Sequence, residues 1–214
     1  MYPRRHLPME PNNYDRIAGF YDVLAGLVFG RARARAQIHL LCHIPAGSRI
    51  LVVGGGTGAL LEELALIHPR GQCITYVEIS ARMSALAAKR KRGANRVDFV
   101  HRAVEQFEDT RPYDVVCTPF LFDNFREEKA AAVFEKLDAL LKPGGLWLYA
   151  DFRPAGRWWQ KKMLAAMYLF FRVVSRIEAD RLTDMAPFFA RGYAQVSEAA
   201  YYAGFIWSAV YRKD

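Results

Sequence analysis

Cysteine is scarce in this sequence. Its 214 residues include three cysteines, Cys42, Cys73 and Cys117, and these show neither a Cys-x-x-Cys pair nor the spacing of metal ligands. An odd, scattered set argues against a disulfide framework and for a reducing compartment. We therefore expect a cytoplasmic protein without disulfides and without a metal site.

Long apolar runs are also missing. The longest, residues 163–171, ends at Arg172 and is far shorter than the roughly 20 apolar residues of a membrane-spanning helix. The charges of residues 4–6 are followed by no apolar segment, so we expect no signal peptide. The net charge of +8 favours anionic partners in general but defines no site.

Neither the basic residues nor the histidines form a specific binding pattern. The arginines of residues 31–36 have the spacing of either a phosphate site or a solvated helix face, and we favour the solvated face. The basic run 89–92 has no interleaved aromatic residues, so we expect no specific contact with nucleic acid. His39 and His43 stand four residues apart but lack a third ligand.

A glycine loop follows a short apolar segment. Residues 50–53 are all apolar and run into the glycines of 54–58, after which 59–67 has a helical pattern. An apolar run without polar alternation is typical of a strand buried on both faces. Glycines let the backbone approach a ligand closely, and the N–H groups of the next helix point at it. The pattern predicts a site for a nucleotide-type cofactor.

Further segments predict a parallel sheet that ends in a hairpin. We expect strands at 73–77, 96–100, 113–117 and 146–150, with helices at 81–92, 126–141 and 158–177. Ser80 and Asn124 are the expected N-caps of the first two of these helices. Strands 192–200 and 205–212 are separated by too few residues for a crossover helix, so they should be antiparallel neighbours.

The glycine loop alone fits two cofactors. Gly54, Gly56 and Ala59 match a dinucleotide fingerprint, with Glu78 about 20 residues further on. Gly54, Gly56 and Gly58 equally match the G-x-G-x-G loop of S-adenosylmethionine-dependent methyltransferases. Both cofactors present ribose hydroxyls to a carboxylate at a strand end, so Glu78 serves either.

Other segments favour the second cofactor. Together they resemble the class I S-adenosylmethionine-dependent methyltransferases: residues 14–18 and 21–22, 55–58, 77–80, 141–145 and the terminal hairpin. Residues 120–124, 192–193 and 202–204 are most similar to the ubiquinone/menaquinone biosynthesis C-methyltransferases of that class. The resemblance extends from residue 14 to residue 213.

The resemblance implies an α/β fold. We expect a Rossmann-like, seven-stranded, mostly parallel sheet with an antiparallel last strand, helices on both faces and an N-terminal helical extension. The chain would be a single domain, 1–214. Within it we expect a helical cap at 1–45, a cofactor-binding core at 46–152, a helical lid or insertion at 153–190 and the hairpin at 191–214.

The resemblance also implies the residues that bind S-adenosyl-L-methionine. These are Gly54, Gly56, Thr57 and Gly58 around the methionine part, Glu78 at the ribose hydroxyls, Ile79 on the adenine face, Ala103 and Val104 at the adenine edge, and Thr118 before Pro119 near the sulfonium. The chain departs from the family pattern at Val52 and Ala103, where acidic or amide side chains are usual, and at Pro119, where a small polar residue is common.

Catalytic candidates are residues at the carboxyl ends of strands, where α/β sheets bind ligands. Four residues meet this condition, and each also has a purely structural interpretation. Asp123 could cap a helix, Asp151 could end a strand, Tyr21 could be a core residue and His101 could be solvated. No single catalytic residue is assigned on this basis.

The sequence therefore predicts methyl transfer to a small, apolar or quinone-like acceptor. Two alternatives stay open, a non-catalytic protein that binds an adenosyl cofactor and an NAD-linked oxidoreductase, although no Tyr-x-x-x-Lys pair supports the latter. The aromatic segment 158–177 with basic residues at its ends is expected to act as a lid, to pack in the core, or to make a peripheral membrane contact. The oligomeric state is not predicted.

Overall fold

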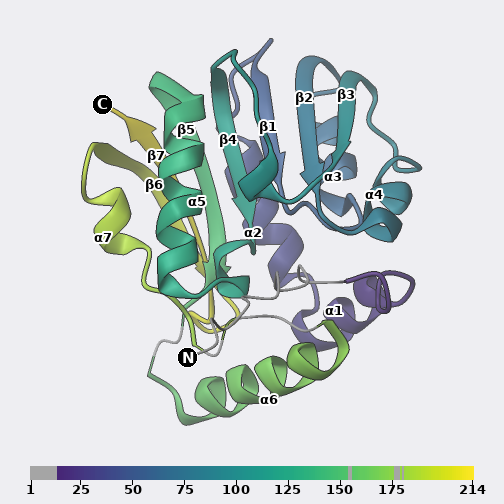
Figure 1. The fold of residues 1–214 in the computed structure, drawn as a ribbon. Coiled ribbons are helices and arrows are strands. Elements are labelled where there is room, and N and C mark those ends of the chain that lie inside the picture. Colours follow the sequence, from purple (N-terminus) through teal and green to yellow (C-terminus); the bar gives the residue numbers. More distant parts are fainter. Residues whose placement is uncertain (1–13, 154–155, 176–178, 180) are drawn as a thin grey trace, which may run out of the picture.

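The computed structural model describes residues 14–153, 156–175, 179 and 181–214. One seven-stranded sheet runs in the order β3-β2-β1-β4-β5-β7-β6 (Figure 1). Its strands are β1 (Arg49–Val53), β2 (Arg70–Glu78), β3 (Ala94–His101), β4 (Tyr113–Pro119), β5 (Leu141–Phe152), β6 (Tyr193–Tyr201) and β7 (Ile206–Lys213). Strands β1 to β5 are parallel, and β7 pairs antiparallel with both β5 and β6. The predicted sheet, including its antiparallel last strand, is confirmed.

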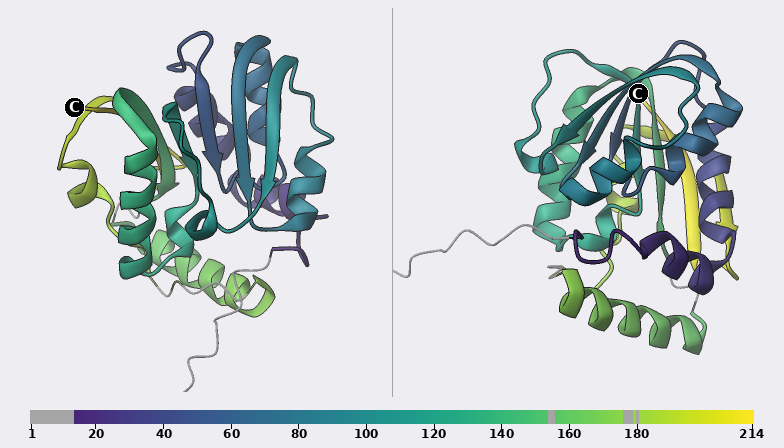
Figure 2. Two further views of the ribbon diagram at one scale, coloured as in Figure 1. Left: turned by 45° about the horizontal axis from the view of Figure 1, so that its top comes forward. Right: turned by 90° about the vertical axis from the view of Figure 1, so that its right-hand side faces the viewer.

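Helices cover both faces of this sheet (Figure 2). They are α1 (Tyr21–Phe29), α2 (Ala32–Leu41), α3 (Ala59–Ile67), α4 (Ala81–Ala87), α5 (Glu127–Leu140), α6 (Trp158–Ser175) and α7 (Ala186–Phe189), with 3₁₀ turns η1 (Val104–Gln106) and η2 (Phe122–Asn124). Successive strand residues point to opposite faces. Ile50 and Val52 of β1 accordingly pack in the cluster under α2 and α3, whereas Leu51 and Val53 pack in the cluster under α5 and α7.

The carboxyl ends of the parallel strands are covered by α1 and α6 (Figure 1). Both views of Figure 2 place α6 beside the N-terminal segment that contains α1. The Phe171 ring of α6 lies 5.9 Å from the Tyr14 ring and 6.5 Å from the Tyr21 ring, between centroids. These aromatic contacts join α6 to the N-terminal segment and enclose the edge of the sheet where a ligand is expected.

Two predicted boundaries were wrong, and a third is tested only in part. Helix α4 ends at Ala87 and not at residue 92, because Lys89 N–H and Arg90 N–H bond to carbonyls three residues back and close a tighter turn. Strand β5 begins at Leu141, so residues 141–145 form an irregular start of the strand and not only a break. The predicted helix 158–177 is α6 up to Ser175, and residues 176–177 lie outside the described residues.

One of the two predicted N-caps is confirmed. The Ser80 Oγ accepts a hydrogen bond of 3.1 Å from the Met83 N–H at the start of α4. Asn124 does not cap α5, whose N-cap is Arg126 without a side-chain hydrogen bond. The Asn124 amide instead donates to the carbonyls of Phe120 and Leu121, both at 3.1 Å, and so holds the η2 turn.

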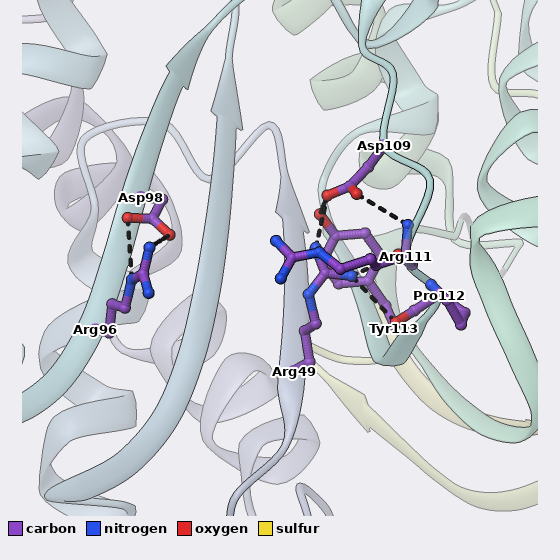
Figure 3. Close-up of polar contacts among 7 residues, drawn as sticks. All are labelled: Arg49, Arg96, Asp98, Asp109, Arg111, Pro112 and Tyr113. Atoms are coloured by element: carbon purple, nitrogen blue, oxygen red, sulfur yellow. Dashed lines mark hydrogen bonds and ion pairs between the residues drawn. The ribbon is translucent and has the colours of Figure 1, made fainter.

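The amino end of β1 is tied to the turn before β4 (Figure 3). The Arg49 guanidinium lies 2.6 Å from Asp109 Oδ2 and 4.0 Å from the centre of the Tyr113 ring. Burial acts to raise the pKa of Asp109, but hydrogen bonds from Arg111 N–H, Tyr113 and Arg49 outweigh it and lower the pKa to about 2. This polar cluster lies at the end of β1 opposite the glycine loop and links β1 to β4 there.

Candidate active site

In the part of the chain that the structure describes, a cavity of about 740 Å³ lies at the carboxyl ends of β1, β2 and β4. The glycine loop and the end of β2 form one part of its wall, through Gly54, Gly56, Thr57, Glu78 and Ile79. Residues of α1, α2 and α6 form another part. The cavity therefore joins the predicted cofactor loop to a largely apolar chamber.

The glycine loop is packed too closely for side chains. A Cβ at Gly54 would stand 2.9 Å from Leu121 Cδ1, and a Cβ at Gly55 would overlap the Tyr76 hydroxyl. Gly54 N–H donates to Val77 O at 2.9 Å, and Tyr76 Oη donates to Gly56 O at 3.0 Å. These contacts set the loop against β2, so its glycines are required by the turn itself as well as by any ligand.

Glu78 is the polar centre of the cofactor end. Its side chain is only 4% exposed, and its two oxygens accept the N–H groups of Gly56 and Ser80, each at 2.9 Å. Burial raises the pKa of the Glu78 carboxyl, while the Ser80 and Gly56 hydrogen bonds act to lower it. A carboxylate has about four lone-pair sites, so Glu78 can accept a further hydrogen bond from a ligand.

Hydrogen bonds and ion pairs hold the N-terminal segment against the glycine loop. Thr57 Oγ1 donates to Asp22 Oδ1 of α1 at 2.6 Å, and Asp22 Oδ2 pairs with Arg90. Arg90 also donates to Thr57 O at 3.1 Å and pairs with Glu62 at 3.2 Å. Arg90 belongs to the basic run 89–92, and in the structure it links the glycine loop to α1 and α3.

Two further contacts anchor the same segment. Tyr14 Oη donates to Asn124 Oδ1 on η2. Asp15 Oδ1 accepts from Ser80 Oγ at 2.5 Å and from Arg82 N–H at 3.1 Å, at the start of α4. The hydrogen bond from Ser80 lowers the pKa of Asp15, while burial acts in the opposite direction. The Tyr-Asp residues of this segment thus have a local structural role beside the cavity.

Three predicted cofactor residues do not line the cavity. A Cβ at Gly58 would lie 2.7 Å from the Ala87 Cα, so Gly58 serves the packing of α4 on the loop. Thr118 is fully buried and accepts the Trp147 indole N–H at 2.9 Å. Ala103 precedes η1 and also lies outside the cavity wall, whereas Val104 lines it. Val52 lies in the core, fully buried.

Asp123 and Asp151 form a buried acidic pair beneath the chamber. Asp151, 3% exposed, accepts the N–H of Phe152 at 2.8 Å and of Asp123 at 3.1 Å. Burial raises the pKa of Asp151 to about 7. Burial and the charge of Asp151 raise the pKa of Asp123 well above its usual range. Only Asp123 of the pair lines the cavity.

The other two catalytic candidates differ in position. Tyr21 lines the cavity, and burial raises its pKa, so its hydroxyl is protonated at neutral pH. His101 is exposed, and its Nε2 lies 2.9 Å from the Ile79 carbonyl outside the cavity. Asp123 and Tyr21 are thus brought together at the chamber, while His101 and the Asp151 carboxyl are not part of its wall. Within the described residues, no cluster of His, Cys, Asp or Glu has a metal-binding arrangement.

Arg33 lies in the chamber and was missed by the sequence interpretation. Residues two apart on a helix are separated by about 200° around its axis. Arg31 and Arg35 therefore share one exposed face of α2, and Arg33 points the opposite way, into the cavity. Its guanidinium carbon lies 4.8 Å from the Phe120 ring centre and 5.2 Å from the Tyr21 ring centre.

Comparison with known proteins is consistent with this geometry. Residues 50–145 match the methyltransferase domain family. A malonyl-[acyl-carrier protein] O-methyltransferase of Ilyobacter polytropus is 28% identical over 48% of this chain and 39% of its own length. The ubiquinone/menaquinone biosynthesis C-methyltransferase UbiE of Pseudomonas putida is 28% identical over 77% of this chain and 66% of its own length. The chain thus spans less than two thirds of either curated relative.

A solved structure shares the fold over nearly the whole chain. The DhpI complex with S-adenosylhomocysteine superposes with a TM-score of 0.69 at 20% identity, covering 94% of this chain and 93% of that one. The sheet order and this superposition show the fold of the class I S-adenosylmethionine-dependent methyltransferases, and residues 50–145 match the methyltransferase domain family. The cofactor of this class is S-adenosylmethionine.

The cavity has the chemistry that this cofactor requires. Helix α3 begins at Ala59, and its N-cap Gly58 offers no side-chain hydrogen bond, so the first N–H groups of the helix have no capping side-chain oxygen. Ala59 and Leu60 line the cavity. This end suits the cofactor carboxylate. Glu78 suits the ribose hydroxyls, and the apolar side chains of Ile79 and Val104 suit the adenine ring. The residues present therefore fit the cofactor.

Replacement of Glu78 should weaken cofactor binding. We expect Glu78→Gln to lower the affinity for S-adenosylhomocysteine by at least about tenfold, because hydrogen bonds to a charged group contribute roughly 1.5–3 kcal/mol. Isothermal titration calorimetry measures this, with circular dichroism to verify folding. Glu105→Gln is the control, since Glu105 also lines the cavity but pairs with Lys129. Equal affinities of Glu78→Gln and wild type would contradict the assignment.

Replacement of Asp123 should stabilise the fold in a pH-dependent way. Its pKa and that of Asp151 are raised in the folded state, so ionisation costs stability as the pH rises from about 4 through 7. We expect Asp123→Asn to raise Tm at pH 8, by about 2–4 °C for each kcal/mol relieved, with little effect at pH 4.5. The exposed Asp98→Asn should show no such trend. A pH-independent difference in Tm would exclude this interpretation.

Proposed function

We propose that the protein transfers a methyl group from S-adenosylmethionine to a small, largely apolar, quinone-like ring. The observation that carries this proposal is the continuity of the cavity from the glycine loop to a chamber walled by aromatic and aliphatic side chains, namely Tyr21, Phe120, Phe152, Met163, Leu164, Met167 and Phe171. Such walls suit a flat ring and leave little space for water. The name of the UbiE relative, a biosynthetic C-methyltransferase of quinones, supports a ring acceptor.

Methyl transfer mainly requires that the cofactor and the acceptor be aligned. The bound cofactor supplies a methyl group that its sulfonium has already activated. The residues of this chain orient the reactants. Glu78 and the α3 N-terminus hold the cofactor, and the apolar chamber holds the acceptor ring. Exclusion of water strengthens each polar contact in the chamber, and correct orientation accounts for much of the rate gain.

The two alternative functions remain outcomes of the same test. A non-catalytic protein would bind S-adenosylhomocysteine and methylate nothing. An oxidoreductase would bind NAD and not S-adenosylhomocysteine, and the antiparallel β7 counts against it. Transfer of label from methyl-tritiated S-adenosylmethionine to naphthols and naphthohydroquinones supports the proposal. Cofactor binding without transfer to any ring acceptor contradicts it.

A polar substitution in the chamber should reduce acceptor use. Met163 lines the cavity from α6, whereas Leu169 on the same helix is 65% exposed. We expect Met163→Gln, which keeps the side-chain length, to raise KM for a naphthol acceptor by about 5–150-fold, because a buried amide without a partner costs about 1–3 kcal/mol. Affinity for S-adenosylhomocysteine should stay unchanged. Leu169→Gln is the control, and equal effects of the two variants would contradict this chamber as the acceptor site.

We also propose that the outer face of α6 contacts an anionic membrane surface. Trp158, Leu169 and Val173 are exposed there by 65–71%, and Lys161, Lys162 and Arg172 are exposed beside them. Apolar and cationic side chains together favour the interface of an anionic bilayer. None of the helices in the described part of the chain has the length and hydropathy to span a bilayer.

Vesicle co-sedimentation tests this contact. We expect binding to vesicles that contain phosphatidylglycerol and much less to phosphatidylcholine alone. The double variant Leu169→Glu with Val173→Glu should abolish binding, whereas Leu66→Glu, on the outer face of α3 and 80% exposed, should not. Binding that is insensitive to lipid charge, or to the α6 variant, would exclude α6 as the contact.

A further inference from the structure

Arg33 has a buried donor that nothing in the described structure satisfies. Its Nε is inaccessible to solvent and has no hydrogen-bond partner among the described residues. A buried donor without a partner costs about 1–3 kcal/mol, and more for a charged group. Because Arg33 also lines the chamber, an anionic ligand there can offset the cost of this buried charge.

The position of the guanidinium is defined by two rings. Phe120 and Tyr21 both lie within cation–π distance of it, at 4.8 and 5.2 Å. Phe120 follows Pro119 at the end of β4 with φ +56°, a left-handed conformation that is unusual for a bulky residue, and its N–H bonds to Ala150 O at 2.7 Å. A strained backbone therefore presents the ring that packs against Arg33.

Other cations of the cavity are already paired or exposed. Arg90 pairs with Asp22 and Glu62, Lys129 pairs with Glu105, and Arg102 is exposed. Arg33 forms no ion pair within 4.0 Å with a described residue. Its charge is thus available in the chamber.

Asp123 also lines the chamber. Burial and the charge of Asp151 raise its pKa well above the usual range, while the charge of Arg33 acts to lower it. A protonated carboxyl donates a hydrogen bond instead of repelling an anion. The raised pKa favours this protonated form, so Asp123 opposes an anion in the chamber less than an ordinary carboxylate would.

We propose that the methyl acceptor enters this chamber as an anion and that Arg33 binds its acidic oxygen, a carboxylate, phenolate or enolate carried by a ring. This inference rests on the proposed function and specifies its substrate class. An acceptor that arrives deprotonated needs no base from the chamber.

Two probes of equal shape test the charge preference. 2-Naphthoate and 2-naphthamide differ in charge but hardly in size, and each is titrated calorimetrically into the protein with and without S-adenosylhomocysteine. We expect wild type to bind naphthoate at least about tenfold more tightly, as a charged hydrogen bond provides. Arg33→Met should lose the preference, Arg33→Lys should keep part of it, and Arg35→Met, on the exposed face of α2, should keep all of it.

Each outcome decides the point. Equal affinity for the two probes in wild type, no detectable naphthoate binding, or a preference that survives in Arg33→Met would overturn the role of Arg33. If Arg33→Met does not fold, a preference unchanged in Arg33→Lys and in Arg33→Gln overturns it equally. Failure to bind S-adenosylhomocysteine contradicts the proposed function instead, and the titration without this ligand still decides on Arg33.

Discussion

The buried carboxylate of Glu78 joins the glycine loop to the start of α4, and the arrangement of the site depends on that junction. One oxygen accepts the N–H of Gly56 and the other the N–H of Ser80. Ser80 in turn caps α4 and donates to Asp15, so the N-terminal segment is positioned through the same turn. A carboxylate that is desolvated and held by backbone donors is rigid, which suits a ligand that must be aligned within a fraction of an ångström.

Much of the fold could be predicted because local signals agree with the long-range packing. Helix α3 has the predicted bounds, since the glycine loop ends at its first residue and Pro69 follows its last turn. The apolar residues 50–53 are central in the sheet and buried on both faces, as their lack of polar alternation implies. The hairpin of β6 and β7 followed from a connection too short for any crossover.

What could not be predicted depends on contacts between distant segments. Charge content alone suggested a solvated face for residues 31–36. The helical period turns Arg33 away from Arg31 and Arg35, but its position against the rings of Tyr21 and Phe120 depends on segments far away in the sequence. Asn124 matched a capping pattern, but its side chain instead accepts a hydrogen bond from Tyr14 and donates one to the Phe120 carbonyl. Thr118 matched a cofactor-binding position of the family, but it lies in the core and accepts a hydrogen bond from the Trp147 indole.

The neighbouring residues Tyr21 and Asp22 face different ends of the cavity. Adjacent positions on a helix differ by about 100° around its axis, so α1 presents the Tyr21 ring to Arg33 and the Asp22 carboxylate to Thr57. One short helix therefore contributes a contact to each end of the cavity, and a shift of α1 at the glycine loop would also move the ring that packs against Arg33.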